Sequence, residues 1–298
     1  IGALAMVGTS KALRSIEVIY RKFANKKPAI SAVAKEALTT AATELNISMD
    51  ELADRIIPDF DFDGLYKHFE VDGDEYRAFV NADFGLSFIN ESNKIRKSVP
   101  PNTSKELKAE FKEIETEIRD VVKSQSGRLE KYMLDERRWA AEDWHNFFFM
   151  NPILFVYAMK LVWGVFDENN NLEQVFYCTE DASLYDVNDD EVAVPADRFV
   201  GILHPALLSI ADRKLWFDKI FDMQLSTIFP IFERTVFSVA DDELELNYTK
   251  HFFNQDVPKG ADFVNTFLVK RNWLKTSGDG ARSNFTKHFR DGKIIADA

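Results

Sequence analysis

Apolar residues are most concentrated in one stretch of the chain, residues 139–163, which reads WAAEDWHNFFFMNPILFVYAMKLVW. Within it, Asn151 and Pro152 predict a helix start, because Asn is a good N-cap and Pro tolerates the first helical position. Gly164 predicts the end of that helix. Every position from 153 to 159 is apolar, which predicts a helix buried on all sides. We expect the rest of the chain to pack around it.

The N-terminal region, residues 1–60, has a helical pattern. Apolar residues recur at helical spacing over about residues 9–24 and again after Pro28, which predicts two paired helices. Ser48 and Glu51 form a capping box that predicts a short third helix. Because the pair is Ala-rich and of suitable length, we interpret this region as the end of a HEAT-like repeat array.

Residues 61–101 change to an alternating pattern of apolar and polar positions. The segments YKHFEV and EYRAFV flank Asp72 and Gly73, a dipeptide that favours a tight hairpin turn, and FGLSFI follows. We therefore predict a small antiparallel β-meander at about residues 65–98.

A mixed α+β domain of unknown function is predicted for residues 102–298. It opens with a capping box of Thr103 and Glu106, followed by apolar residues every three or four positions. This pattern predicts one long helix over about residues 104–138, with Gly127 as a candidate bend.

The predicted fold class is therefore α+β. It consists of an N-terminal HEAT-like helical hairpin, a small antiparallel β-meander, a long helix, and a mixed helical and β core around the fully buried helix. In that core VFDENNNLEQVFYC predicts a β-hairpin around an Asn-rich turn, and LWFDKIF and STIFPIFERTVF are helical or extended segments divided at Pro230. The opening IGALAMVG resembles the end of a helix, so we expect a piece of a longer protein that is truncated at both ends.

Composition narrows the classes of partner. With 46% hydrophobic residues among 298, the chain fills a substantial core. Its net charge is −12, which opposes nucleic-acid binding, because that affinity depends on neutralising phosphates. Residues 167–198 hold 10 acids and 1 base, a local −9, whereas residues 259–298 hold 8 bases and 4 acids, a local +4. We expect a protein partner and the rest of its own longer chain as partners, with nucleic acid unlikely and no membrane.

The absence of a membrane partner rests on the apolar stretch itself. Spanning a bilayer requires about 20 apolar residues, and here Asn151, Pro152 and Lys160 interrupt the run. Cys178 is the one cysteine, which excludes an internal disulfide and a cysteine zinc site. We therefore expect a cytoplasmic protein.

No sequence motif specifies a chemistry. The chain contains no GxxxxGK[ST], GxGxxG, HExxH, GxSxG or CxxC pattern, and we expect no cofactor and no metal. The acidic loop 186–191 resembles a calcium loop at Asp186, Asn188 and Asp190, but Glu191 stands where a Gly is required. We interpret it as a solvated acidic loop.

His204, Arg137, Arg138 and Arg234 are the candidate site residues. His204 lies in the apolar segment FVGILHPALL, where an imidazole serves as an acid or base, or as a core residue bonded to a backbone carbonyl. Arg137 and Arg138 follow the long helix, where cations suit the helix dipole, and their guanidinium groups also suit an anion pocket. The last candidate, Arg234, would complete such a pocket.

The residues that carry a family likeness are Leu129, Glu130, Met133, Arg137, Arg138, Trp139, Asn151, Pro152, Ile153, Leu154, Leu161, Val162, Trp163, His204, Pro205, LADRIIPDF, Trp273, Gly278, Asp279 and Gly280. Through them the chain resembles the bacterial domain-of-unknown-function family 4132, found in MolR-like (molybdate metabolism regulator-like) proteins, over most of its length and as their C-terminal region. Members are long cytoplasmic bacterial proteins with upstream helical repeats, and some carry a WGR domain. One departure is the segment TIFPIFER, which keeps Phe229 and Arg234 but lacks the two glutamines of the family pattern.

The resemblance implies no established activity. Our leading hypothesis is a non-catalytic regulatory or protein-interaction module of a larger protein, because catalytic signatures are absent and the start of the chain is a helical pair. One alternative is an unrecognised enzyme or an anion-binding domain that uses His204 and the arginines. Another is a nucleic-acid-linked regulator, suggested by the WGR domains of the family and by the basic C-terminal residues.

Overall fold

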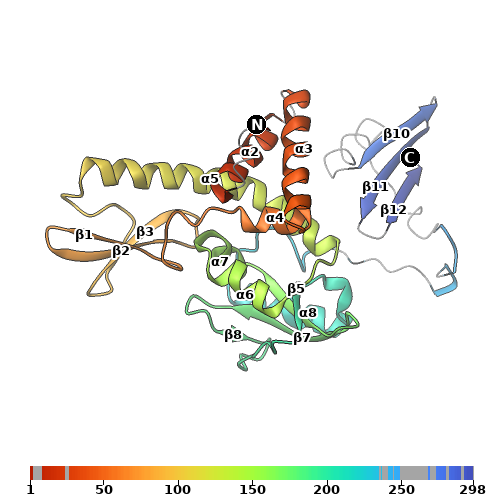
Figure 1. Cartoon of the computed structure of the whole chain (residues 1–298). Helices are drawn as coiled ribbons and strands as arrows, with labels where there is room; N and C mark the ends of the chain where they lie inside the picture. The colour runs from red at the N-terminus through yellow and green to blue at the C-terminus, as the bar shows by residue number, and fades with distance from the viewer. Residues whose placement is uncertain are drawn as a thin grey trace.

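The computed structural model describes residues 1–2, 9–23 and 27–234, and toward the C-terminus residues 236, 241–243, 245–248, 268, 273–279, 282–289 and 292–297. Its helices and antiparallel sheets confirm the α+β class (Figure 1). Gly280 and part of the STIFPIFERTVF segment lie outside the described residues.

The N-terminal helices form a unit with its own core. α2 (Ser10–Phe23) packs against α3 (Pro28–Glu44), and the short α4 (Met49–Arg55) follows, as predicted. The Ser48 hydroxyl accepts a hydrogen bond from the backbone N–H of Glu51 at 3.0 Å, so the cap of α4 is confirmed. The HEAT-like character of this unit stays a prediction. Its buried apolar side chains are Leu13, Ile16, Ala34, Leu38, Ala41, Ala42, Leu52 and Ile56.

The predicted β-meander is a four-stranded antiparallel sheet in the order β1-β2-β3-β4. Both residues of the Asp-Gly turn between the first two strands have a positive φ, 57° and 89°, which suits a two-residue hairpin turn. The strands are β1 (Lys67–Val71), β2 (Asp74–Val80), β3 (Leu86–Asn90) and β4 (Ile95–Arg96).

The N-cap of the long helix α5 (Lys105–Leu134) lies one residue after the predicted one. Ser104 is the N-cap, and its hydroxyl accepts from the backbone N–H of Leu107 at 3.1 Å. The predicted capping role of Thr103 is wrong, because its hydroxyl donates instead to the carbonyl of Pro100 at 2.8 Å. That bond closes the turn after the two prolines and leaves the helix cap to the next residue.

α5 is continuous through Gly127 and ends before Arg138, the predicted end. Its 30 residues correspond to about 45 Å at ~1.5 Å per residue. Glu136 has a φ of 51°, and the backbone N–H of Arg137 donates to the carbonyl of Tyr132 at 2.9 Å. This pattern is a Schellman motif, which ends the helix and turns the chain toward the next strand.

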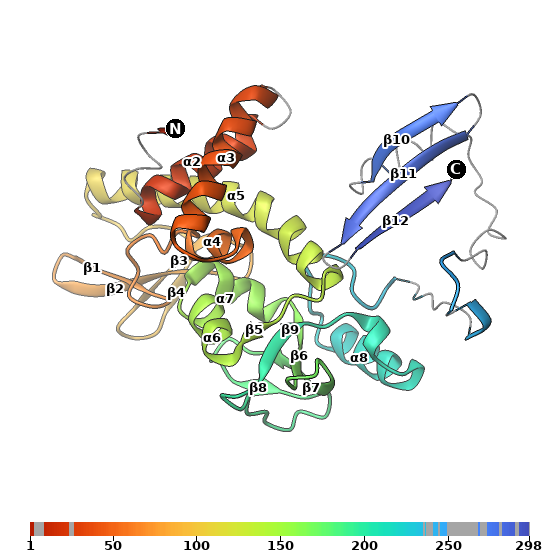
Figure 2. The same cartoon turned by 45° about the vertical axis from the view of Figure 1, so that its right-hand side comes forward.

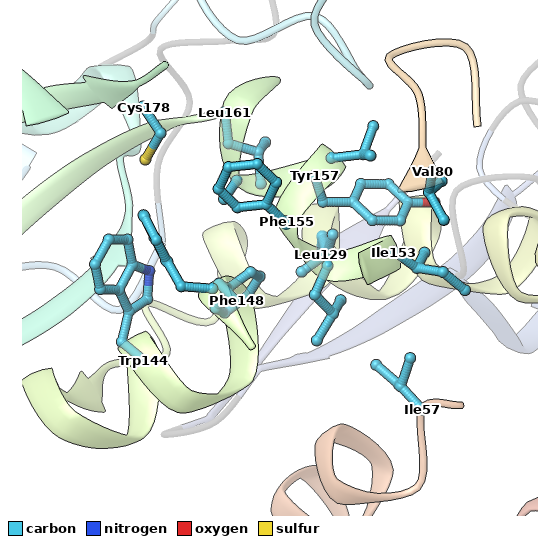
Figure 3. Packing of buried hydrophobic residues seen from close by; sticks show 14 of the residues in the cluster. Ile57, Val80, Leu129, Trp144, Phe148, Ile153, Phe155, Tyr157, Leu161 and Cys178 are labelled. Carbon is cyan, nitrogen blue, oxygen red and sulfur yellow. The ribbon is translucent and has the colours of Figure 1, made fainter. Parts of the chain in front are cut away.

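The apolar stretch forms two helices, with a short strand before them and the start of another strand after them. α6 (Ala141–Phe149) precedes α7 (Pro152–Met159), whose cap Asn151 accepts from two backbone N–H groups at 3.0 Å. All side chains from 152 to 158 are buried, which confirms the predicted buried helix; Figure 3 shows this packing. Among the described helices, none combines the length and apolar character needed to cross a membrane.

The central sheet has five antiparallel strands in the order β5-β9-β6-β7-β8. The predicted hairpin around the Asn-rich turn is confirmed as β6 and β7. The five strands are β5 (Trp139–Ala140), β6 (Val162–Phe166), β7 (Leu172–Cys178), β8 (Leu184–Tyr185) and β9 (Phe199–Ile202).

Gly164 does not end a helix, so that prediction is wrong. α7 already ends at Met159, and Gly164 lies in the middle of β6. A Cβ atom on Gly164 would lie 2.7 Å from Leu172 Cδ1 and 2.8 Å from Phe166 Cε2. The glycine therefore gives these two side chains room over the sheet.

A single hydrophobic cluster joins the meander to the central sheet. It includes Phe88 of β3, Phe111 of α5, Tyr157 of α7 and Trp163 of β6. The domain boundaries at residues 60 and 101 stay predictions. Two further parts follow the central sheet: α8 (Ile210–Asp222), and a three-stranded antiparallel sheet of β10 (Leu274–Asp279), β11 (Arg282–Phe289) and β12 (Gly292–Asp297).

Two glycine substitutions are expected to have opposite effects. Gly164→Ala lowers the free energy of unfolding by about 1–3 kcal/mol, because the new methyl group overpacks the sheet. Gly127→Ala raises it by about 0.5–1 kcal/mol, because Gly127 lies in a helix and a Cβ there meets no atom within 4 Å. Urea denaturation of both variants measures the two changes; equal changes would contradict this account of the two positions.

Candidate functional site

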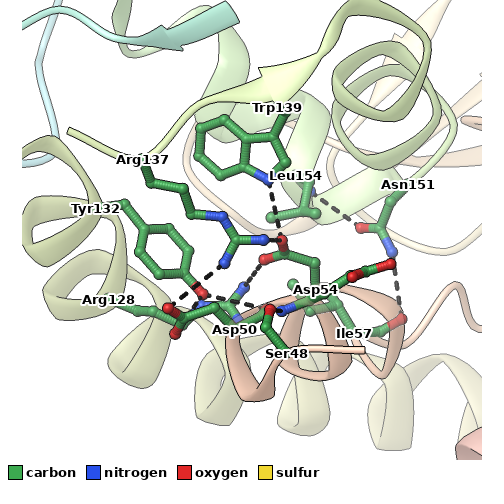
Figure 4. Close-up of polar contacts among 11 residues, drawn as sticks. Ser48, Asp50, Asp54, Ile57, Arg128, Tyr132, Arg137, Trp139, Asn151 and Leu154 are labelled. Carbon is green, nitrogen blue, oxygen red and sulfur yellow. Dashed lines mark hydrogen bonds and ion pairs between the residues drawn. The ribbon is translucent and has the colours of Figure 1, made fainter. Parts of the chain in front are cut away.

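A buried carboxylate, Asp54 on α4, lies at the border between the two hydrophobic clusters. Only 5% of its surface is exposed. Leu52 of the same helix and its C-cap residue Ile56 belong to the N-terminal cluster, whereas Ile57 belongs to the large central one. The helical spacing of these residues places the carboxylate where α4 meets α5 and the start of β5, as Figure 4 shows.

Two arginines and a tryptophan bind Asp54. Arg128 Nη2 lies 3.1 Å from Oδ1, and Arg137 Nη2 lies 2.5 Å from Oδ2. The indole N–H of Trp139 donates to Oδ2 at 3.0 Å. Both arginine side chains are largely buried as well. The three partners come from α5, from the turn after it and from β5, so the carboxylate fastens α4 to all three segments.

Tyr132 completes the cluster as an aromatic platform. The guanidinium of Arg137 lies over its ring at 4.4 Å from the centroid and over the Trp139 ring at 5.0 Å. The Tyr132 hydroxyl donates to the carbonyl oxygen of Asp50 at 3.3 Å. Stacking of this kind holds the planar guanidinium in one orientation, which a lysine cannot reproduce.

Burial dominates the electrostatics of the cluster. It raises the pKa of Asp54, and the positive charges of Arg128 and Arg137 oppose that rise. Burial also raises the pKa of Tyr132, which keeps its hydroxyl protonated as a donor to Asp50.

The contacts of Asp54 with Arg128, Arg137 and Trp139, which we call the joint, suit a structural role better than a catalytic one. Both oxygens of Asp54 are engaged by side chains of the same chain. A general acid or base must reach the reacting group directly or through one water, and this buried carboxylate is enclosed by its partners. A second polar contact lies nearby: the side-chain amide of Asn151, the cap of α7, donates a hydrogen bond to the backbone carbonyl of Pro58 at 3.1 Å.

The four residues predicted from the sequence do not share one environment. Arg137 binds Asp54, and Arg138 lies over the Phe166 ring at 3.6 Å from its centroid. Arg234 forms an ion pair with Glu130 of α5. The structure therefore brings the guanidinium of Arg137 to the joint and that of Arg138 to the central sheet. The binding of an anion by any of these arginines stays a prediction.

His204 and Arg234 are electrostatic neighbours. His204 Nδ1 accepts from the backbone N–H of Ala206 at 3.2 Å and so caps the 3₁₀ turn η1 (Pro205–Leu207). Burial lowers the pKa of His204, Glu136 opposes the shift, and Arg234 adds to it. The capping hydrogen bond explains the position of this imidazole without any catalytic role. The predicted catalytic role of His204 stays untested.

The acidic loop 186–191 uses its carboxylates for its own turn. Asp186 Oδ1 accepts from the backbone N–H of Asn188 at 2.7 Å and of Asp190 at 3.0 Å. Asp189 accepts from the hydroxyl of Tyr177 at 2.6 Å and pairs with Lys219, so the loop is fastened to α8. In the part of the chain that the structure describes, no group of three His, Cys, Asp or Glu side chains is placed to hold a metal ion.

α8 has an exposed apolar face. Ile210, Phe217 and Phe221 are 81%, 41% and 74% exposed, and their spacing of seven and four residues places them along one strip of the helix. An adjacent face of the helix packs through Trp216 and Ile220 against the central sheet. Exposed apolar side chains that form a contiguous patch mark an interaction site, whereas single exposed apolar residues are common on any surface.

Sequence reasoning did not select Asp54 and Arg128. Asp54 lies within the segment LADRIIPDF, in which apolar Leu52 and Ile56 flank the acid. An acid between two buried apolar positions of a short helix was the available signal. It did not identify the partners, which lie 74 and more residues further along the chain.

The fold and the joint define an α+β module with helices fastened to its N-terminal side. Residues 94–273 match the family model described as "Domain of unknown function (DUF4132)", which covers more than half of the chain. The chain belongs to this family. It is also similar to the "Uncharacterized protein YehI" of Escherichia coli (strain K12), with 25% identity over 228 residues. That match covers 73% of the chain but only 19% of the relative, so the chain spans about a fifth of its length. No solved structure matches the chain.

Removing the carboxylate of Asp54 is expected to be strongly destabilising. Asp54→Ala leaves the buried guanidinium of Arg128 without its carboxylate and that of Arg137 with only the exposed carboxylate of Asp50 at 3.9 Å, and so lowers the free energy of unfolding by about 3–5 kcal/mol. Chemical denaturation measures the loss. The matched control is Glu51→Ala on the same helix, which removes an exposed ion pair with Arg55 and costs at most about 1 kcal/mol. Equal losses in the two variants would contradict a joint at Asp54.

His204 is expected to make stability dependent on pH. The folded-state pKa lies below the unfolded value of about 6.5, so folding favours the neutral ring. Its contribution is complete above about pH 6.5 and is lost as the pH falls below that value. His204→Asn keeps a capping side chain but does not titrate. The melting temperature of this variant should fall less between about pH 7.5 and 5.5 than that of the parent. Parallel curves for the two proteins would refute the assignment.

Proposed function

We propose that this chain is a non-catalytic protein-interaction module of a longer cytoplasmic protein. The observation that carries the proposal is the exposed face of α8, where Ile210, Phe217 and Phe221 are open to solvent on a helix anchored by its other side. The polar candidates support the same conclusion, because Arg137 and Arg234 already have carboxylate partners within the chain.

In this proposal the N-terminal helices belong to a scaffold and the DUF4132 region presents the binding face. α2 and α3 pack as a helical pair with a core of their own, as units of a HEAT-like array do. The joint at Asp54 would keep that array in a fixed orientation to the central sheet. A regulatory role and the MolR-like assignment are part of the same proposal, and they rest on the likeness of the sequence to that group.

A photocrosslinking amino acid at position 217 tests the proposal in the full-length protein in its own cells. We expect protein adducts from position 217, and a decrease of at least about tenfold when Ile210→Asp is added, because a buried charge weakens an apolar contact. The same crosslinker at Glu113, an exposed position on α5, is the control and is expected to give few adducts.

Adducts of equal yield from both positions, or none from position 217, would refute an interaction face on α8. The catalytic alternative has a separate signature. The protein is an enzyme, and the proposed interaction module is wrong, if the intact protein turns over a substrate and that activity is lost in His204→Ala but retained in Phe217→Asp.

A further inference from the structure

We propose that the exposed face of α8 binds the same face of a second copy of this chain, in an antiparallel arrangement. This inference deepens the proposed function and rests on it, since it names the partner of the same face. The three apolar side chains supply the contact, and the charged residues along their margin select the partner. Figure 2 shows α8 at the edge of the central part of the molecule.

The charges beside the strip are self-complementary. Lys214 and Asp218 are both exposed, lie one helical turn apart on the same flank of the strip, and form no ion pair with any described residue. A twofold axis near Trp216 brings two α8 helices together in opposite directions. Lys214 of each copy then faces Asp218 of the other, and the two ends of the apolar strip, Ile210 and Phe221, meet.

A parallel arrangement lacks this match. A twofold axis parallel to the helices would place the charged flanks of the two copies on opposite sides of the contact, so Lys214 and Asp218 of one copy would not meet those of the other. A closed antiparallel pair is also the self-complementary contact that a twofold axis requires, in which the same surface of both copies is used. The order of charges along α8 therefore favours the antiparallel dimer.

The contact is expected to be weak and reversible. α8 has 13 residues and is about 20 Å long, whereas a standard stable interface buries about 800 Å² on each partner. Each copy also has a net charge of −12, which opposes association at long range. At physiological salt the Debye length is about 8 Å, so this repulsion is screened and the close contacts between Lys214 and Asp218 decide the arrangement.

Sedimentation equilibrium over about 1 μM to 1 mM protein tests the proposal. We expect the average mass to rise from monomer toward dimer. Lys214→Asp and Asp218→Lys should each weaken self-association by at least about tenfold, because each substitution occurs at two symmetric contacts per dimer. A mixture of the two variants should associate again, since one then has acids and the other bases at both positions.

The matched control is Leu215→Asp. Leu215 is an exposed apolar residue of the same helix, 53% exposed, but lies on a different face, so this variant should associate like the parent. Circular dichroism of each variant checks that the helices remain folded.

If the protein is a monomer at every concentration, a second copy is not the partner of this face. The same conclusion follows if the protein dimerises and neither charge reversal weakens the dimer. If position 217 nevertheless crosslinks to a different protein, the proposed interaction module stands and only this inference fails. If neither association nor crosslinking occurs, both fail.

Discussion

The burial of the Asp54 carboxylate is the interaction on which the arrangement of this molecule depends. It lies between two hydrophobic clusters that share no side chain, one within the N-terminal helices and one around α7. Apolar contacts are not directional, so they would not fix the angle between the two parts. The hydrogen bonds that the Arg137 guanidinium and the Trp139 indole N–H donate to one carboxylate are directional and fix that angle, and Arg128 adds an ion pair beside them.

The same constraint explains why the turn after α5 has its unusual backbone. The chain must leave the helix, place Arg137 under the carboxylate and enter β5 within a few residues. Glu136 adopts a left-handed conformation to do so. Gly201 on the neighbouring strand β9 then allows the turn to approach, because a Cβ there would lie 2.9 Å from the carbonyl oxygen of Arg137. The joint therefore includes a backbone requirement on a strand that never contacts Asp54.

Local signals in the sequence predicted most of the fold, but they did not predict the long-range pairings. Ser48 and Asn151 act on the backbone two or three residues away, and both were identified as caps. Gly164 was misread because a glycine after an apolar run marks either a helix end or a close approach, and the distinction depends on Leu172 across the hairpin. The role of Asp54 was not predicted for the same reason, since its partners are distant in the sequence and one short helix gives no sign of them.

The candidate interaction face illustrates the limit most clearly. Along α8, the sequence shows apolar residues on nearly every side of the helix, so periodicity alone does not say which side is buried. The structure assigns Trp216 to the core and leaves Phe217 and Phe221 exposed. Within one helix, a lysine four residues before an acid is the less favourable order for an ion pair. Lys214 and Asp218 have this order, so little stability within the chain is lost when both turn toward a partner.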